Sequence, residues 1–300
     1  MVRKNREIAF YGKGGIGKST MVSNVAAALA EEGKRVLVVG CDPKSDCTRN
    51  LRGDVVMPTV TKILLEKTSA PLELSEFVYG KEIKAEDIVY EGFKGIACIE
   101  VGGPEPGVGC AGRGVSLAID LIHRIVLDKL EPDIIFYDIL GDIVCGGFGM
   151  NLRKGFADQA IIVTSSDYLA VFAANNICKG IYRYADRSGT PLGGIIYNVR
   201  GLLDDISLVE EFADEIGSRI IGDVKNSRSI MESEIYAQTV IEREPESGTA
   251  DAFRALAKKV IDNTDCISPR PLTDEKLAEL AQKIRERTRL SHEETAEGSR

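Results

Sequence analysis

Short runs of consecutive apolar residues recur along the chain, and longer segments between them carry apolar residues at helical spacing. A strand that is buried on both faces of a parallel sheet shows such an uninterrupted apolar run. We therefore predict strands at 7–11, 35–39, 96–101, 133–138, 160–164, 194–197 and 219–221. Helical periodicity predicts helices at 19–32, 60–67, 115–130, 250–262 and 272–288.

Strands that alternate with helices in this order predict an α/β fold, with a mostly parallel twisted sheet covered by helices on both faces. No linker splits the pattern, so we expect one domain over residues 1–270, followed by a C-terminal helix and polar tail over 271–300. The helix at 272–288 has mixed charge and no aromatic residue, which favours docking on its own domain or a second subunit over membrane binding. We expect the polar end at 291–300 to be disordered and 50–93 to be less regular.

The first predicted strand is followed by a glycine-rich segment that reads GKGGIGKST. Between a strand and a helix, this G-x-x-x-x-G-K-[ST] pattern is typical of the phosphate-binding loop (P-loop) of an NTPase. Lys18 would reach the β- and γ-phosphates of a nucleotide, and Ser19 would hold Mg²⁺. A second lysine, Lys13, follows the first glycine directly, as in deviant Walker A loops. The predicted nucleotide-binding residues of the loop are Gly12, Lys13, Gly14, Gly15, Ile16, Gly17, Lys18, Ser19 and Thr20.

Carboxylates follow two further predicted strands, at the edge where α/β sheets bind ligands. Asp138 ends one apolar run, in the place of a Walker B carboxylate that orients Mg²⁺ or its waters. Asp42 and Asp46 follow the strand next to the P-loop, with Lys44 between them. One of these two aspartates would act on Mg²⁺ and the other on the attacking water. The alternative for all three carboxylates is turn formation, around Pro43 in the case of Asp42 and Asp46.

Two other glycine-rich segments, 102–114 and 141–149, each follow a predicted strand and contain one cysteine, Cys110 and Cys145. We expect 102–114 to lack regular structure because it combines many glycines with prolines. Glycine lets the backbone approach a bulky ligand and leaves N–H groups free to donate to inorganic sulfide. A lone cysteine is usually a small buried hydrophobe, but the matching surroundings favour cluster ligands. A [4Fe–4S] cluster needs four thiolates, which a two-fold dimer would supply, two from each chain.

Composition limits the partners, the location and the metal ligands that we expect for this protein. The net charge of −8 argues against nucleic acid as a partner. The sequence shows no signal peptide and no apolar stretch of transmembrane length, so we expect a cytoplasmic protein whose cysteines are thiols or ligands. Only His123 and His292 are present, which argues against a histidine-based metal site or triad. The cysteines outside the glycine-rich segments are expected to be packing residues or spare thiols: Cys41, Cys47, Cys98, Cys178 and Cys266.

Together these motifs resemble the iron protein of nitrogenase, the dinitrogenase reductase family, from about residue 8 to 263. The cysteine segments are highly specific to that family, whereas the P-loop is shared with many ATPases. The matching stretches are YGKGGIGKST (11–20), GCDPK (40–44), GGPEPGVGCAGRG (102–114), YD (137–138), GD (141–142), VCGGF (144–148), AANNI (173–177) and LGG (192–194).

The resemblance implies a homodimeric ATP-dependent reductase with MgATP and one [4Fe–4S] cluster, bridged by Cys110 and Cys145 of both chains. It implies that Lys13 contacts the nucleotide across the dimer interface and that Asn198 lies beside the adenine. Asp42, Lys44 and Asp46 resemble a first switch, and the stretch from Asp138 to Asp142 a second. Arg113 would lie at the docking face for the electron-accepting partner, a nitrogenase-like catalytic component, and a ferredoxin or flavodoxin would supply electrons.

The chain departs from the nitrogen-fixing pattern in several places, and residues 54–93 and the C-terminal tail differ most. Lys225-Asn226-Ser227 stands where Pro-Arg-Asp is usual, and Cys47 stands where serine is common. These departures suggest a nitrogenase-like relative rather than a nitrogen-fixing member proper. Its partner would then reduce C–S bonds of methylthio-alkanes, which we slightly favour, or a nickel tetrapyrrole, with chlorophyll biosynthesis fitting least and nitrogen fixation remaining an alternative.

A partition or septum-positioning ATPase of the same deviant P-loop group is the rival from a different class. Such nucleotide-switched binding modules share Lys13, Lys18 and the sheet. They have no need of Cys110 and Cys145 in glycine-rich segments, and their DNA or membrane contacts require a basic or aromatic face that this acidic chain lacks. The sequence therefore favours the iron–sulfur reductase.

Overall fold

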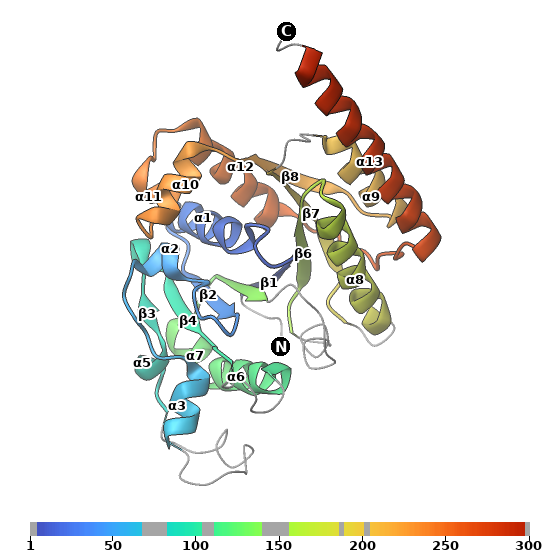
Figure 1. Cartoon of the computed structure of the whole chain (residues 1–300). Coiled ribbons are helices and arrows are strands. Elements are labelled where there is room, and N and C mark those ends of the chain that lie inside the picture. Colours follow the sequence, from blue (N-terminus) through green and yellow to red (C-terminus); the bar gives the residue numbers. More distant parts are fainter. Residues whose placement is uncertain are drawn as a thin grey trace.

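The computed structural model describes residues 5–67, 83–103, 111–139, 156–185, 189–200 and 205–297. An eight-stranded sheet with the order β3-β4-β2-β5-β1-β6-β7-β8 lies at its centre (Figure 1). All neighbouring strands are parallel except the short edge pair β3–β4. The strands are β1 (Arg6–Tyr11), β2 (Val36–Cys41), β3 (Tyr90–Glu91), β4 (Ala97–Glu100), β5 (Ile134–Ile139), β6 (Gln159–Thr164), β7 (Leu192–Val199) and β8 (Ile220–Lys225).

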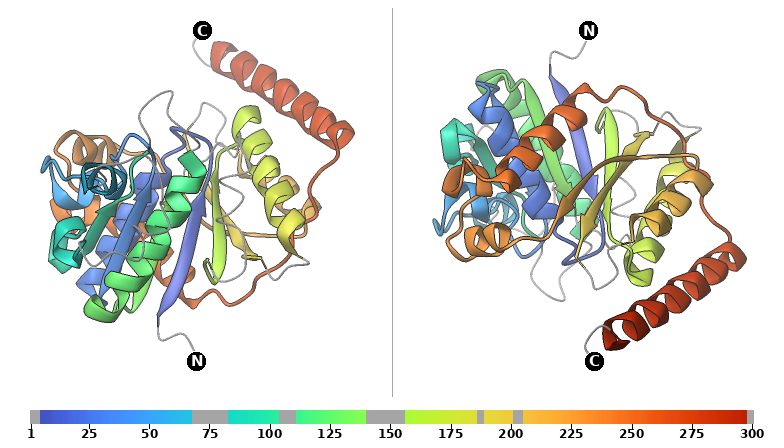
Figure 2. Two further views of the ribbon diagram at one scale, coloured as in Figure 1. Left: turned by 90° about the horizontal axis from the view of Figure 1, so that it is seen from below. Right: turned by 90° about the horizontal axis from the view of Figure 1, so that it is seen from above.

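Helices cover both faces of this sheet, as the sequence predicted (Figures 1 and 2). One face is covered by α1 (Lys18–Glu31), α10 (Arg228–Ile235), α11 (Val240–Arg243) and α12 (Gly248–Asp262). The other is covered by α3 (Val60–Lys67), α5 (Ala85–Ile88), α6 (Ala111–Ile125), α8 (Tyr168–Ala185) and α9 (Ile206–Glu215), and α13 (Asp274–Glu297) packs against α8 and α9. The short elements are α2 (Arg49–Arg52), η1 (Phe93–Gly95) and α7 (Leu127–Leu130). The predicted fold class, an α/β fold of the P-loop type, is confirmed.

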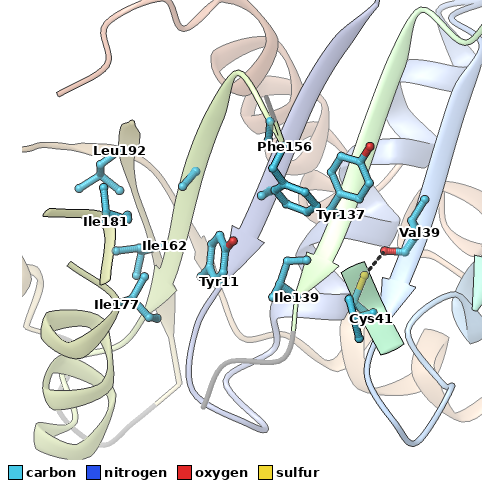
Figure 3. Packing of buried hydrophobic residues seen from close by; sticks show 14 of the residues in the cluster. Tyr11, Val39, Cys41, Tyr137, Ile139, Phe156, Ile162, Ile177, Ile181 and Leu192 are labelled. Atoms are coloured by element: carbon cyan, nitrogen blue, oxygen red, sulfur yellow. Dashed lines mark hydrogen bonds between the residues drawn. The ribbon is translucent and has the colours of Figure 1, made fainter. Parts of the chain in front are cut away.

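The two-sided burial explains the apolar runs in the sequence. In β1, Ile8 and Phe10 pack into the cluster beneath α1 and α12, whereas Ala9 and Tyr11 pack into the cluster on the opposite face. Figure 3 shows Tyr11 within that second cluster, among side chains from neighbouring strands and α8. Because successive residues of a strand point to opposite faces, both sets must be apolar when both faces are covered.

The C-terminal helix is longer than predicted. It runs to Glu297, so the expectation of disorder from residue 291 is wrong for 291–297. No Gly or Pro interrupts the stretch, which is rich in Ala, Glu, Arg and Lys, all strong helix formers. Leu277, Leu280 and Ile284 are buried, and Lys283 pairs with Glu211 of α9. The helix therefore docks on its own chain, which is one of the two predicted arrangements.

One other expectation also needs correction. Helix α6 begins at Ala111, so the last four residues of the glycine-rich segment 102–114 are helical rather than irregular. Within 50–93, the single-turn elements α2 and α5 and the two-residue strand β3 are too short to produce a periodic signal. None of the helices in the described ranges combines the length and apolar character needed to cross a bilayer.

Candidate nucleotide-binding site

A cavity of about 430 Å³ opens where β1, β2 and β7 end, at the carboxyl edge of the sheet. The P-loop, the segment after β2, the end of β7 and α10 all contribute to it. The predicted residues that line it are Lys13, Gly14, Gly15, Gly17, Lys18, Ser19, Thr20, Asp42, Lys44, Asp46 and Asn198. Segments that lie far apart in the sequence are therefore brought together as predicted.

The P-loop has the backbone geometry that its glycines allow. Gly15 and Gly17 have φ angles of 74° and 91°, and Gly17 stands directly before the first residue of α1. A Cβ atom on Gly17 would lie 2.6 Å from Nδ2 of Asn198. That same nitrogen donates a hydrogen bond of 2.6 Å to the carbonyl of Ile16. Asn198 therefore supports the loop from β7 while it lines the cavity.

A buried ion pair joins Lys18, which lines the cavity, to Asp138 of β5. The ammonium of Lys18 donates to Oδ1 of Asp138, and the two residues are 7% and 0% exposed. Burial alone lowers the pKa of Lys18, but the Asp138 carboxylate, helped by its hydrogen bond, raises the net pKa above its usual value. Lys18 is therefore a fixed positive charge at neutral pH.

The second carboxylate oxygen of Asp138 is a candidate ligand for a cation. Oδ2 is buried and has no hydrogen-bond partner in the described part of the chain. Ser19, the residue after Lys18, lines the cavity. A carboxylate oxygen and a hydroxyl beside a phosphate site are ligands that suit Mg²⁺ bound to a nucleotide. The residues present therefore fit the predicted MgATP.

The segment after β2 forms the turn that the sequence left open as an alternative, and it also lines the cavity. Oδ1 of Asp42 accepts a hydrogen bond of 2.9 Å from the backbone N–H of Lys44, and the carbonyl of Asp42 accepts one of 3.0 Å from the N–H of Ser45. Asp42 thus makes a turn around Pro43. It also lines the cavity with Lys44 and Asp46, so the turn brings three charged residues to the cavity.

Sequence reasoning missed three polar contributors to the site. Thr20 donates its hydroxyl proton to Glu234 of α10, and Arg200 donates to the carbonyl of Gly15. Glu234, Arg200 and Asn226 all line the cavity. Glu234 lies outside any recognisable motif. The available signals were the position of Asn226 in the segment where Pro-Arg-Asp is usual and that of Arg200, two residues after Asn198.

The predicted cluster ligands Cys110 and Cys145 lie outside the described residues, as does Asp142. Arg113 lies in the first turn of α6, and its side chain is likewise not described. The other cysteines are thiols, four of them buried, in agreement with their predicted packing role. Burial raises the pKa of Cys98 to about 12, so that thiol stays protonated. No group of His, Cys, Asp or Glu side chains in the described ranges has the arrangement of a metal site.

The fold and this cavity define a P-loop nucleotide-binding protein. Solved structures of that class share the fold. One is a ParA family ATPase from Chlorobium tepidum TLS (TM-score 0.61, 21% identity, covering 85% of this chain and 99% of the other). Another is the septum site-determining protein MinD with Mg-ADP from Pyrococcus horikoshii OT3 (TM-score 0.57, 20% identity, 85% and 96%). At these identities the likeness concerns the fold alone.

Residues 6–287 match the family model described as 4Fe-4S iron sulfur cluster binding proteins, NifH/frxC family, and the chain belongs to this family. The chain is 53% identical over 283 residues to nitrogenase iron protein 2 of Methanothermococcus thermolithotrophicus, covering 94% of this chain and 97% of that one. It is 50% identical over 290 residues to the nitrogenase iron protein of Methanococcus voltae, covering 96% and 100%.

Family membership confirms the predicted class of protein. The chain is an ATP-hydrolysing iron–sulfur reductase component with a [4Fe–4S] cluster and MgATP as cofactors. The suggestion that it stands apart from nitrogen-fixing members has no support, because both relatives carry the name nitrogenase iron protein. The departures at Cys47 and at 225–227 therefore do not by themselves indicate a different partner.

Proposed function

We propose that this chain acts as a homodimer that passes low-potential electrons to a separate nitrogenase-type catalytic component, and that ATP hydrolysis times the transfer. The observation that carries the proposal is the buried pair of Asp138 with Lys18, which lines the phosphate cavity, in a chain of a cluster-binding family. We place the protein in the cytoplasm, with a ferredoxin or flavodoxin as electron donor.

The residues divide into three roles. Lys13 and Lys18 neutralise phosphate charge, with Lys13 acting across the dimer interface, while Ser19 and Asp138 hold Mg²⁺. Asp42 and Asp46 orient the attacking water or the metal, with Lys44 beside them. Bound Mg²⁺ would supply charge neutralisation to the phosphates. Asn198 lies on the adenine side.

The cluster would be held by Cys110 and Cys145 of each copy. Asp138 is the second-last residue of β5 and stands only seven positions before Cys145 in the sequence, with Asp142 between them. A shift of the chain after β5 in response to the γ-phosphate would therefore reach a cluster ligand within seven residues. Arg113, three residues after Cys110, would contact the catalytic component.

The names of the relatives favour nitrogenase itself as the electron acceptor. The preference for a C–S bond-reducing partner, and the alternative of a nickel tetrapyrrole, rest on sequence impression alone. We therefore propose a nitrogenase-type catalytic component and keep those two as the outcomes to be excluded.

A reconstitution experiment separates these partners. The reduced protein would be mixed with MgATP and a purified nitrogenase catalytic component from a methanogen, and oxidation of the cluster followed by stopped-flow absorbance. We expect MgATP-dependent oxidation with that component and none with MgADP. Oxidation by a C–S reductase or tetrapyrrole reductase component instead would refute the choice of partner.

A further inference from the structure

Glu100 is a buried carboxylate next to the nucleotide site that the proposed mechanism does not use. It pairs in register with Gly40 of β2, and Gly40 in turn pairs in register with Asp138 of β5. Residues in register on parallel strands point to the same face of the sheet. With strands about 4.8 Å apart, the Cα atoms of Glu100 and Asp138 lie about 10 Å from each other, on either side of a residue without a side chain.

The missing side chain of Gly40 makes room for the Glu100 carboxylate. A Cβ atom on Gly40 would lie 2.3 Å from Oε2 of Glu100 and 2.6 Å from Cβ of Cys47. Glu100 is 0% exposed. The Glu100 carboxylate therefore lies over Gly40 of β2, with the Cβ atom of Cys47 close to the same position.

One oxygen of Glu100 holds the far end of that segment. Oε1 accepts hydrogen bonds of 2.7 Å from both the backbone N–H and the hydroxyl of Thr48. Thr48 is fully buried, and its own hydroxyl oxygen accepts from Nε of Arg52 at 3.1 Å. The carbonyl of Thr48 accepts from the N–H of Leu51, at the start of α2. Every polar group of Thr48 is thus engaged, and two of the contacts end on one carboxylate oxygen.

The segment between Cys41 and Thr48 is therefore fastened at both ends. Cys41 belongs to β2, and Thr48 is bound to Glu100 of β4. The residues between them include Asp42, Lys44 and Asp46, which line the nucleotide cavity. We propose that Glu100 is a positioning residue that, through Thr48, fixes this switch segment so that its charged side chains face the phosphates.

Charged groups surround Glu100 in a way that suits this role. Burial raises its pKa to about 7, although the two bonds from Thr48 and the nearby Arg52 guanidinium act in the other direction. Asp138 raises the pKa further from β5. The buried thiols of Cys41, Cys47 and Cys98 each have a raised pKa and stay neutral. The hydrogen bonds of Thr48 are what make a carboxylate tolerable at this place.

The test removes the Thr48 hydroxyl and follows two readouts on the intact protein. Thr48→Val keeps the shape and the backbone donor, and Thr48→Ser keeps both donors. Lys44 is exposed within the segment, so the rate of tryptic cleavage after it reports how firmly the segment is held; cleavage after the exposed Lys94 is the internal control. The second readout is the kcat and KM of MgATP hydrolysis.

We expect Thr48→Val to speed cleavage after Lys44 about tenfold and to lower kcat about tenfold, because about one charge-assisted hydrogen bond is lost. The KM and the rate of cleavage after Lys94 should not change. Thr48→Ser should behave as the unaltered protein. Glu100→Gln should lie between, because a neutral acceptor binds more weakly. Glu91→Gln, which alters an exposed glutamate on β3, should change nothing.

The inference about hydrolysis rests on the proposed function, but the cleavage readout does not. Equal cleavage after Lys44 in all variants, or a Thr48→Ser variant as impaired as Thr48→Val, would overturn the positioning role. A raised KM together with faster cleavage after Lys94 would mean general loosening and would also overturn it. The unaltered protein could hydrolyse no ATP while Thr48→Val still speeds cleavage after Lys44. The proposed function would then be refuted, and the positioning role of Glu100 would be supported.

Discussion

Lys18, the first residue of α1, lines the nucleotide cavity and is paired with Asp138 of β5, although 120 positions separate the two in the sequence. The pair joins the P-loop to the strand that precedes the predicted cluster cysteine Cys145. Nucleotide phosphates would compete with Asp138 for the Lys18 ammonium. The same contact therefore serves stability and offers a route by which phosphate occupancy reaches β5.

Replacing Lys18 should destabilise the protein, because its partner Asp138 is buried. In Lys18→Met, the Asp138 carboxylate is left buried without a counter-charge, so we expect a loss of about 3–5 kcal/mol in the free energy of unfolding. Nucleotide binding should also be abolished. Urea unfolding and calorimetry with MgADP would measure the two effects.

The double variant Lys18→Met/Asp138→Asn is the control for that experiment. It removes both charges, so its unfolding free energy should be higher than that of Lys18→Met alone. If the double variant is less stable than the single one, the pair does not contribute in this way.

Glu100 should give the protein a specific dependence of stability on pH. Its pKa rises from 4.5 to about 7 on folding, so the folded protein holds more protons than the unfolded chain between these values. Stability should therefore fall as pH rises through this window and level off above it. Glu100→Gln lacks this effect, so its stability relative to the unaltered protein should improve by about 2 kcal/mol between about pH 5.5 and pH 8. Denaturant unfolding across that range would measure it, and a pH-independent difference would contradict it.

The P-loop glycines should differ in their tolerance of a side chain. Gly17 has a φ of 91°, and a Cβ there would meet Asn198 at 2.6 Å, so Gly17→Ala should cost about 1–3 kcal/mol of stability and disturb the loop. Gly14 has an ordinary φ and open space around its Cβ position. Gly14→Ala should therefore leave the melting temperature nearly unchanged in a thermal scan. Equal destabilisation by both changes would show that neither the positive φ of Gly17 nor its contact with Asn198 limits the loop.

The sequence predicted the central strands well because β1, β2, β5 and β6 are buried on both faces, whereas the partly exposed edge strand β3 was missed. The apolar runs at 133–138 and 160–164 match β5 and β6 within one residue at each end. The P-loop was equally visible, since its glycines, lysines and hydroxyls must be adjacent in sequence to form one anion site. Asp138 was found because it stands at the end of such a run.

The parts that sequence could not predict depend on contacts between distant segments. Glu234 joins the site through Thr20, which is 214 positions away in the sequence. Glu100 of β4 binds Thr48, which follows β2 and is 52 positions away. Neither residue carries a local pattern. The end of α13 was misjudged for another reason: polar composition suggested disorder, although its residue types favour a helix.

The cysteine assignment can be tested separately from the nucleotide site. Cys110→Ala and Cys145→Ala should each abolish the cluster, because each removes two of four thiolates from a dimer. MgADP affinity should change little, since the cavity is lined by other residues. Cys178→Ala, a buried thiol on α8, is the matched control and should keep its iron. Iron retained by either of the first two variants would contradict the assignment.

The most direct test of the whole account is the iron content and absorbance of the protein purified without oxygen. A [4Fe–4S] cluster shared by two chains predicts a brown dimer with about four irons per dimer, whose visible absorbance bleaches on reduction. A colourless, iron-free protein that still dimerises with ATP would contradict the central claim that this nucleotide site serves an electron carrier.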